Sequence, residues 1–488
     1  MNLLNDDFIS TTAGKVSLKT ILTSDQDYQL QYYFDEIQLA MLQLLSSLTT
    51  VVLNPTIVEL KNHLKHGVSQ QQYDEALKKI NSEWFEADCF MQSKPPADAK
   101  WPDAPITKML SGVECGTSPN AIGLFSEADK AQVICPDCIH GLNYNLHMNI
   151  KGECFGPTGA TGIRGGGAIS TLIAGESLKL TLLNNTIAYD YYNDYAQLNK
   201  NANDEPMWIN AQIGSIYQAQ KIGLIRGLFA LAYHTDFTIE DAACVCDICG
   251  SESSQSVTTF NREKYKGHYG STKNGRENGA GLWPHPYTPC NKKEDGIYAV
   301  CARDQNWQSW QELSSYIVGK ETDKATFFPA YIIQQFKKMK GSRHTNLLVG
   351  GNIADQGSIT GRVYDLYSMP SSLNSNLAKI TQVIDSGLEQ KERLSHAFNK
   401  MFGVGYDKNF VGGIKSEAMS RFTANAQQII QSTFLDVERK EASELRKSAV
   451  AELKQEAKRI FMGVQRKYQH DLPLFKALVK GEVALYKK

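Results

Sequence analysis

The stretch of sequence that decides the fold begins with Cys135-Pro-Asp-Cys138 and ends in the glycine-rich run GPTGATGIRGGG at residues 156–167. A Cys-x-x-Cys pair can fix a loop by holding a metal ion. Glycine has no Cβ, so a glycine-rich backbone can lie close against another surface, such as a phosphate or the floor of a groove. Together the two features predict a stapled platform that presents bare main chain to a polymer, which is not how a catalytic pocket is built.

A second pair, Cys246-Asp-Ile-Cys249, follows 108 residues after the first. Four thiolates are what a closed tetrahedral zinc site needs, so we expect the two pairs to clip two distant loops together. Cys244 is a weaker alternative ligand because of its offset, and two unrelated pairs of buried cysteines remain the other explanation. A catalytic zinc normally has a His-x-Glu or His-Glu-x-x-His partner, and the sequence contains neither.

Composition places the chain among ordinary globular proteins. Its 488 residues are 42% hydrophobic and 21% charged, and the formal net charge of -1 excludes a wholly basic nucleic-acid binder. The charge is uneven, because residues 437–488 hold 13 Lys and Arg against 7 Asp and Glu. This positive segment suits a subunit of a nucleoprotein assembly, although a solvated helix face is the commoner explanation of such a pattern.

The N-terminal sequence predicts no export. Asp6 and Asp7 stand where a secretory signal is basic, and no apolar core follows them. The most apolar window, residues 37–53, is interrupted by six Gln, Ser and Thr residues, which favours a buried helix over a membrane span. We therefore expect the ten cysteines in a reducing, cytoplasmic compartment, where paired spacings indicate a metal more often than a disulfide.

Periodicity and breaker residues predict a mixed N-terminal part. Ser24 or Asp25 is expected to cap a long helix that ends at Asn54, because the residue before a proline disfavours the helical region. Leu347 to Ile359 is typical of a tight hairpin between two short strands. The other expected elements are short strands within residues 1–23 with a turn at Gly14, helices at 73–86, 106–110 and 325–338, and an irregular connection at 90–105.

The pattern changes to long amphipathic helices from about residue 371. Breaks near residues 403–413 and 471–473 separate about four helices, so we expect an antiparallel four-helix bundle. The predicted fold is α+β, with a large mixed domain at residues 1–365 that carries the zinc-stapled loops, and the bundle at residues 366–488. One apolar stripe of this part consists of Leu445, Ala449, Leu453, Ala457, Phe461 and Val464.

Seven short blocks of sequence follow one another along the chain. They are Met1-Asn-Leu-Leu4, Phe90-Met-Gln-Ser-Lys94, Cys135-x-x-Cys138, Gly162-Ile-Arg-Gly-Gly166, Ile222-Gly-Leu-Ile-Arg-Gly-Leu-Phe229, Cys246-x-x-Cys249-Gly250 and Gly281-Leu-Trp-Pro-His-Pro-x-x-Pro-Cys290. Each block alone is modest, but their ordered combination is highly specific. In that order the chain resembles the CasA family, the large subunits of the type I-E CRISPR surveillance complex Cascade.

The resemblance implies a subunit that is not an enzyme. The family recognises the protospacer-adjacent motif of double-stranded DNA, largely from the minor groove, and starts strand separation so that guide RNA can pair. It also docks a separate helicase-nuclease. The implied partners are therefore double-stranded target DNA, guide RNA, the other Cascade subunits and the helicase-nuclease, with no membrane.

Two functional side chains of the family correspond to single positions here. Its lysine finger corresponds to Lys264. Its glutamine wedge, a side chain driven between base pairs, corresponds to Gln356, with Asp355 and Gly357 beside it. Unstacking a base step costs about a few kcal/mol, so a wedge needs a rigid hairpin beneath it.

The resemblance also implies two DNA-contacting loops and a structural zinc site. The family's glycine loop corresponds to Gly156 through Gly159, where Pro157 and Thr158 replace glycines, and a proline has no N–H to donate. The family's loop with exposed apolar residues corresponds to Leu124, Phe125 and Ser126. Its zinc ligands correspond to Cys135, Cys138, Cys246 and Cys249.

Two further hypotheses come from the residues alone. Arg164, within the glycine-rich run, is a candidate phosphate contact, and the basic loop around Lys264 suits the backbone of a nucleic acid, although solvated loop lysines are commoner than functional ones. The alternative function is a zinc-dependent hydrolase that acts on nucleic acid. That function requires a metal with a bound water.

Overall fold

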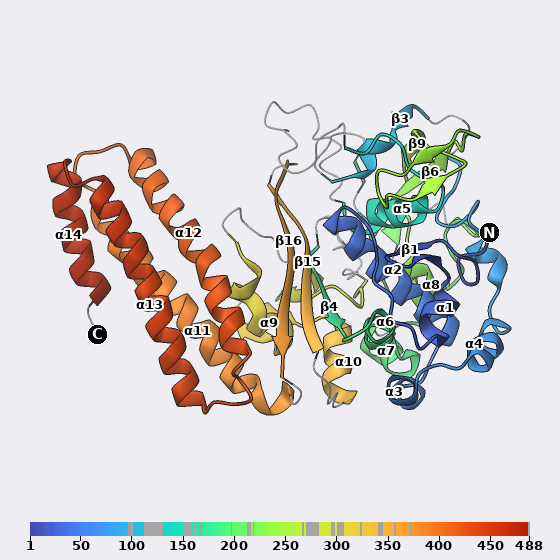
Figure 1. Ribbon diagram of the computed structural model, residues 1–488, viewed down its shortest axis with the longest axis horizontal. Coiled ribbons are helices and arrows are strands. Elements are labelled where there is room, and N and C mark those ends of the chain that lie inside the picture. The colour runs from blue at the N-terminus through green and yellow to red at the C-terminus, as the bar shows by residue number, and fades with distance from the viewer. Residues whose placement is uncertain are drawn as a thin grey trace. The chain divides into compact units, whose positions relative to one another are not determined.

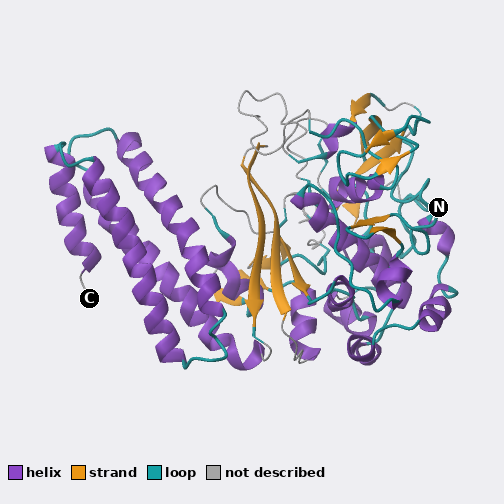
Figure 2. Cartoon of the chain, in the orientation of Figure 1, coloured by secondary structure: helices purple, strands orange, loops and turns teal. Residues whose placement is uncertain are grey.

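The described part of the chain forms two compact units. In this computed structural model it comprises residues 1–95, 97, 101–111, 130–150, 159–160, 162–164, 168–196, 198–211, 216–217, 219–265, 268–269, 283–293, 298–299, 307–322, 325–339, 345–355, 358–370 and 373–486. The first unit mixes helices and strands, as predicted, and long helices dominate the second (Figure 2). The first unit consists of Met1–Gln305, Gly319–Met339 and Thr345–Leu366, and the second of Asn306–Val318, Lys340–His344 and Tyr367–Lys488.

Helix α2 (Asp35–Leu53) lies in the core of the first unit. Sixteen of its 19 residues are buried, and it ends at Asn54, whose positive φ of 35° precedes a proline, as predicted. Among the described helices it is long and apolar enough to cross a membrane, but 89% of its most apolar window is buried inside the protein. Such burial is typical of a core helix.

The predicted start of this helix was wrong by about ten residues. Ser24 is the C-cap of a short separate helix, α1 (Leu18–Thr23), and α2 begins only after Phe34. The intervening chain is extended because its backbone pairs with the first strand region, Thr12 N donating to Gln29 O and Gln31 N to Ser10 O, both at 3.0 Å. A tertiary pairing thus overrides the local capping signal.

Helix α5 (Cys138–Met148) packs against α2 and is buried along its whole length. The close approach depends on Gly141, because a Cβ there would come within 2.6 Å of the Met41 sulfur. The helix starts at the second cysteine of the first pair. The metal-binding motif and the core therefore share one continuous element.

Three strands form a sheet in the order β16-β15-β4, with bounds Ser358–Met369, Thr345–Asp355 and Ser170–Ala174. The predicted hairpin exists, but its strands have 11 and 12 residues and were not expected to be so long. Figure 1 shows them as long neighbouring strands. Gly350 allows β15 to pass close to α2, because a Cβ there would lie 2.8 Å from Leu39 Cδ2.

A second sheet pairs β9 (Thr259–Lys264) with β3 (Asp103–Pro105) on one side and with β6 (Tyr233–Phe237) on the other. Both pairings are antiparallel, and the β6–β9 register places Tyr233 opposite Lys264. Short strand β3 interrupts the connection that was expected to be wholly irregular.

Two of the blocks that carry the family resemblance pack against each other. In α8 (Leu224–Leu228), a Cβ on Gly227 would come within 2.2 Å of the Trp283 ring. The Trp283 indole N–H in turn donates to Ile222 O at 3.2 Å. Packing therefore explains why these residues occur in the two blocks, and the resemblance that the blocks carry is evidence about the fold.

Other expected elements of the first unit were partly correct. Helix η2 (Ile106–Met109) and strands β1 (Ile9–Thr11) and β2 (Gly14–Val16) confirm the predictions, and Gly14 has φ +100° at the turn. The helix expected at 325–338 is strand β14 (Ala325–Phe328) followed by α10 (Tyr331–Met339), because residues 325–328 pair with two neighbouring strands. The helix expected at 73–86 is α4 (Gln70–Leu77) followed by η1 (Ser82–Phe85).

The remaining described elements of the first unit are short. The helices are α3 (Ile57–His66), α6 (Leu178–Asn184), α7 (Tyr189–Ala196) and η4 (Ala219–Lys221), and the strands are β5 (Ile216–Tyr217), β7 (Cys244–Val245), β8 (Glu252–Ser253), β10 (His268–Tyr269), β11 (Cys290–Lys293), β12 (Tyr298–Ala299) and β13 (Lys320–Thr322).

The second unit is built on α11 (Leu373–Phe398), α12 (Lys408–Phe434), α13 (Ala442–Lys467) and α14 (Leu472–Tyr486), which lie side by side in Figure 1. Helix α11 packs against the other three, and α13 also packs against α12. The predicted stripe of α13 is buried except for Val464, which is half-buried. The break expected at 403–413 is shorter, because Asp407 caps α12 by accepting from the N–H groups of residues 409 and 410. Short helices η6 (Ser309–Glu312), α9 (Leu313–Ile317) and η7 (Asn399–Met401) complete the unit.

Candidate metal centre and nucleic-acid interface

Four cysteine sulfurs lie together in the first unit. Cys135, Cys138, Cys246 and Cys249 are buried, and their Sγ atoms all lie within 4.8 Å of one another. The Cys135 and Cys249 sulfurs are 3.8 Å apart and those of Cys138 and Cys246 are 3.6 Å apart, far longer than a disulfide bond of about 2.05 Å. Cys244 lies outside this group, and its thiol donates to a backbone carbonyl at 3.4 Å. The predicted grouping of the two pairs is confirmed.

The spacing of the four sulfurs suits a tetrahedral metal ion. Sulfurs about 2.3 Å from a central zinc stand about 3.8 Å apart, because that is the edge of the tetrahedron they form. The separations of 3.6 and 3.8 Å lie close to that edge. Four sulfur donors fill the shell and leave no position for a catalytic water. The chemistry of this donor set therefore favours a structural ion.

Backbone hydrogen bonds hold the two cysteine loops against each other. The Asp247 carboxylate accepts from Gln132 N at 2.7 Å and from Val133 N at 2.9 Å, and Asp247 N donates to Val133 O at 3.0 Å. Within the second loop, Gly250 N donates to Cys246 O at 2.8 Å with a positive φ of 74°, a turn that favours glycine. These hydrogen bonds position the two loops so that the four sulfurs face one another.

A neighbouring positive charge suits a thiolate cluster, while the pKa shifts of the four thiols run in opposite directions. Hydrogen bonds from Cys135 and Cys138 lower the pKa of the Cys246 thiol to about 7 and also lower the pKa of Cys249. Hydrogen bonds to Cys246 and Cys249, together with burial, raise the pKa of Cys135 and of Cys138. Lys15 Nζ lies 4.0 Å from the Cys135 sulfur and forms an ion pair with Asp137 between the two ligands of the first pair. A positive charge beside the cluster offsets part of the negative charge that metal-bound thiolates carry.

Helix α5 leads from the cysteine cluster to a position beside Gly162 of the glycine-rich run. Eleven residues at about 1.5 Å each give a rod of about 16 Å between Cys138 and Met148. Near its C-terminus, His147 Nδ1 accepts from Ala232 N at 3.1 Å, and its carbonyl lies where a Cβ on Gly162 would come within 2.6 Å. Burial lowers the pKa of His147 to about 3, so the ring is a neutral acceptor.

Lys264 is the last residue of β9 and is half-buried. It lies opposite Tyr233 in the register, and the Arg262 guanidinium lies 5.3 Å from the centre of the Tyr233 ring. Side chains two residues apart on one strand point to the same face of a sheet, and so do side chains that stand directly opposite each other on neighbouring strands. Lys264, Arg262 and Tyr233 therefore lie on one face of the β6–β9 pair.

The glycine-rich run reaches this same face. The Tyr233 hydroxyl accepts from Ala160 N at 2.8 Å, and Ala160 directly follows Gly159. Tyr233 is 1% exposed, so the bond is shielded from water. The structure thus brings Gly159, a predicted DNA-contacting residue, to the face that carries Lys264, with Tyr233 as the common support.

Arg164 does not have the surroundings of a phosphate contact. Its side chain is buried, at 1% exposure, and it donates to Thr288 Oγ1 at 2.8 Å, to Ser170 Oγ at 2.7 Å, to Met148 O at 3.3 Å and to the Asn149 side chain. A guanidinium enclosed by protein acceptors cannot reach a solvent-side phosphate. The expected phosphate contact at Arg164 is therefore corrected to a role in holding the end of α5 and the start of β4.

The hairpin position is known from its strands. Asp355 ends β15 and Ser358 begins β16, so residues 356 and 357 connect two adjacent strands of the sheet. The other predicted contacts lie outside the described residues and stay predictions: Gln356, Gly357, Gly156, Pro157, Leu124, Phe125 and Ser126.

Sequence reasoning missed Tyr233 and the buried charged pair Glu36 and Arg362. Tyr233 gave no signal, because an aromatic residue at the start of a strand is ordinary. Glu36 had one: a carboxylate in the first turn of a helix whose later residues are all uncharged is either an exposed cap or a buried ion-pair partner. Only the three-dimensional pairing distinguishes these two explanations.

Comparison with known proteins gives one consistent result. The family described as CRISPR-associated protein Cse1 matches residues 2–460. The fold is similar to that of Thermus thermophilus CasA (Cse1), with a TM-score of 0.70, 14% identity and coverage of 99% of this chain and 98% of that chain. It is also similar to Thermobifida fusca Cse1, with a TM-score of 0.69, 12% identity and coverage of 99% and 97%. A chain of a CRISPR RNA-guided surveillance complex matches with a TM-score of 0.66, 14% identity and coverage of 100% and 99%.

Proposed function

The chain belongs to the CRISPR-associated Cse1 family, and on that premise we propose that it is the large subunit of a type I-E Cascade complex. In this role it recognises the protospacer-adjacent motif of double-stranded DNA and starts strand separation for guide RNA pairing. Base pairing with the guide then reads the remaining sequence, so the protein needs to recognise only a short motif. The proposed partners are target DNA, guide RNA, the other Cascade subunits and a helicase-nuclease that docks after target binding.

The observation that carries this proposal is the convergence on Tyr233. One face of the β6–β9 pair holds Lys264 and Arg262, and the Tyr233 hydroxyl anchors the backbone beside Gly159 at the same place. A cation and a bare main-chain loop on a shared support suit contact with the backbone and edge of a duplex. Lys264 is proposed as the finger, and Gln356, between β15 and β16, as the wedge.

The four cysteines are proposed to hold zinc in a structural role. Sulfur ligands and tetrahedral spacing favour this ion over the hard cations that prefer oxygen. The ion would cross-link the loop before α5 to the loop after β7. These two loops lead into elements of the unit that carries the proposed duplex-binding face. A closed four-sulfur shell supplies no activated water, which supports a subunit without catalytic activity over a zinc-dependent hydrolase.

Helices α11 to α14 are proposed to act as an antiparallel four-helix bundle within the assembly. Residues 437–488 carry 13 Lys and Arg against 7 Asp and Glu, which suits contact with nucleic acid or with an acidic neighbouring subunit. A cytoplasmic location is part of the same proposal, because free thiols at metal spacing belong in a reducing compartment.

The test uses the complete complex with guide RNA and two DNA substrates. One is a duplex that carries the motif, and the other is the complementary single strand. Lys264→Ala and Gln356→Ala should each weaken duplex binding about tenfold or more while single-strand binding stays within about twofold, since the single strand needs no motif recognition or unstacking. Lys61→Ala, an exposed lysine of α3, is the matched control and should change neither. Equal losses on both substrates would make Lys264 and Gln356 general contacts and would reject the proposal.

A further inference from the structure

A single buried carboxylate stands at the start of the core helix. Glu36, in the first turn of α2, is the one acidic side chain that is buried among the residues the structure describes. It accepts from Ser111 N at 3.2 and 3.1 Å, from Asn145 Nδ2 at 3.0 Å and from Arg362 Nη2 at 2.6 Å. Burial raises the pKa of the Glu36 carboxyl, and Arg362 opposes that rise. All its partners come from other segments of the chain.

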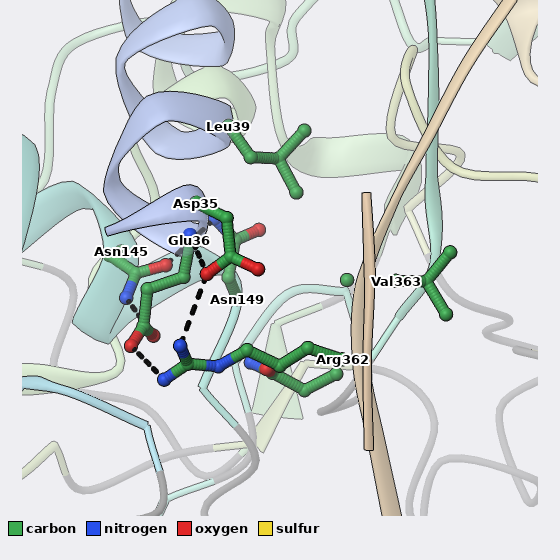
Figure 3. A pocket seen from close by; sticks show the side chains of 9 residues that line it. Asp35, Glu36, Leu39, Asn145, Asn149, Arg362 and Val363 are labelled. Carbon is green, nitrogen blue, oxygen red and sulfur yellow. Dashed lines mark hydrogen bonds and ion pairs between the residues drawn. The ribbon is translucent and has the colours of Figure 1, made fainter. Parts of the chain in front are cut away.

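Arg362 reaches this carboxylate from the second strand of the hairpin. Its side chain is 12% exposed, and the guanidinium donates to Glu36 and, at 3.1 Å each, to Asp35 Oδ1 and to Ser111 O. Figure 3 shows the guanidinium spanning both carboxylates at the end of α2, with Asn145 on the other side of Glu36. A planar guanidinium fork can make these bonds together, which a lysine cannot.

Ser111 joins both strands of the hairpin to the same point. It bonds to Glu36 through its N–H and to Arg362 of β16 through its carbonyl, and its hydroxyl accepts from Asn352 Nδ2 of β15 at 3.0 Å. Residue 111 also precedes the segment that carries Leu124 and its neighbours in sequence. Both strands of the hairpin are therefore fixed, through Arg362 and Ser111, on one buried carboxylate.

The same network continues towards the glycine-rich run. Asn149 Nδ2 donates to Asn145 Oδ1 at 3.1 Å, and the side-chain amide oxygen Oδ1 of Asn149 accepts from Arg164. Arg164 Nη2 also donates to Ala168 O at 3.4 Å, at the far side of the glycines. The network thus joins side chains of α2, α5, β15 and β16 with Ser111, and Arg164 extends it to the described part of the glycine-rich run.

Such a network is a costly way to gain stability. Burying an ion pair sacrifices hydration, and apolar side chains of similar volume often serve stability as well or better. What a buried ion pair does supply is a unique arrangement, because any shift leaves a charge without its partner. A duplex wedge needs that fixed geometry, since the cost of unstacking must be offset by contacts made at the same time.

We infer that Glu36 and Arg362 are positioning residues for duplex recognition, whose buried pair fixes the β15–β16 hairpin to helix α2. They touch no DNA themselves. This inference rests on the proposed function, and it adds that motif recognition depends on a contact made beneath the DNA-facing residues. It also explains why a charged pair is kept in the core at the first turn of α2.

The test measures duplex and single-strand affinity of the complete complex carrying Glu36→Gln, which keeps the shape of the side chain and removes its charge. Duplex affinity should fall about tenfold while single-strand affinity stays within about twofold, as expected for a coupling that acts only through the hairpin. Arg362→Lys keeps the charge without the fork and should give an intermediate loss. In a complex that already carries Gln356→Ala, adding Glu36→Gln should cause no further loss of duplex affinity, because the two act through the same contact.

A matched control separates positioning from general destabilisation. Gln335→Met removes two buried hydrogen bonds, to Thr186 and Ala188, from a part of the same unit outside this network. It should lower the thermal stability without changing the ratio of the two affinities. If Glu36→Gln prevents assembly, Asn352→Ala cuts a milder link of the same network and should lower duplex affinity about threefold.

Two outcomes would overturn the inference. One is an equal loss of affinity for both substrates, and the other is a loss from Glu36→Gln that multiplies independently with that from Gln356→Ala. If Lys264→Ala and Gln356→Ala selectively lower duplex affinity and Glu36→Gln does not, the inference alone fails. If Lys264→Ala and Gln356→Ala lower both affinities equally, the proposed function fails and the inference fails with it.

Discussion

Replacing Cys246 by serine should destabilise the first unit far more than the loss of one buried thiol explains. A metal ion held by all four sulfurs links Cys135 to Cys249, which are 114 residues apart. In the chain-entropy account, closing a loop of that length restricts the unfolded chain by about 4.8 kcal/mol at 25 °C, which gives the scale of the effect. Serine is a poor zinc ligand, so the variant should lose the ion and most of this contribution.

The assay is urea unfolding of the purified chain, with zinc and after chelation by EDTA, together with measurement of bound zinc. The unmodified chain should lose up to about 4.8 kcal/mol of unfolding free energy on chelation, and Cys246→Ser should show that loss without the chelator and no further response to it. Cys244→Ser is the matched control. Its thiol lies outside the cluster, so it should cost less than about 1 kcal/mol and keep the full response to chelation.

The reasoning would be refuted in either of two ways. In the first, chelation removes zinc and leaves the unfolding free energy of the unmodified chain unchanged, which would mean that the hydrogen bonds between the two loops hold them without the ion. In the second, Cys246→Ser and Cys244→Ser have equal stability and equal zinc content, which would mean that the cluster does not bind the ion.

Three other predictions follow from contacts in the first unit. Tyr233→Phe leaves the buried Ala160 N–H without its 2.8 Å acceptor and should cost about 1–3 kcal/mol in urea unfolding; a change below about 0.3 kcal/mol would show that the bond contributes nothing. Gly227→Ala places a Cβ 2.2 Å from the Trp283 ring and should cost about 1–3 kcal/mol through overpacking, with a shift of Trp283 fluorescence; unchanged fluorescence would contradict the close packing. Burial lowers the pKa of His147 to about 3, so the neutral ring stabilises the fold above the ordinary pKa of about 6.5, and the unfolding free energy falls by about 2 kcal/mol between pH 7 and pH 5. His147→Gln should flatten that part of the curve of unfolding free energy against pH. Equal slopes for the variant and the unmodified chain would refute the assignment.

The sequence predicted features that depend on short-range chemistry. The cysteine spacings predicted the sulfur cluster, Asn54 before a proline predicted the end of α2, and Gly14 predicted a turn. The α13 stripe was also predictable, because a helix that buries one face repeats its apolar residues every three or four positions. In each case the residue type constrains the backbone or the burial wherever it is placed.

Features that depend on distant partners were not predictable. The start of α2 was misplaced because residues 29–31 pair with the first strand, and no local signal records that pairing. Arg164 was taken for a phosphate contact because glycines and an arginine suggest an exposed loop, yet its acceptors come from α5, β4 and Thr288. The importance of Tyr233 likewise depends on Ala160, 73 residues away.

The stretch between Asn149 and Ala160 is tethered at both ends, by Arg164 and Gln43 at one end and by Tyr233 at the other. Both anchoring bonds are made by residues at the ends of the stretch, so they do not depend on which side chains lie between them. Under the proposed function, substitutions between the two anchors change which flanking bases are favoured and leave both anchoring bonds in place. Pro157, at a position to which the family resemblance assigns a glycine, is a difference of this kind.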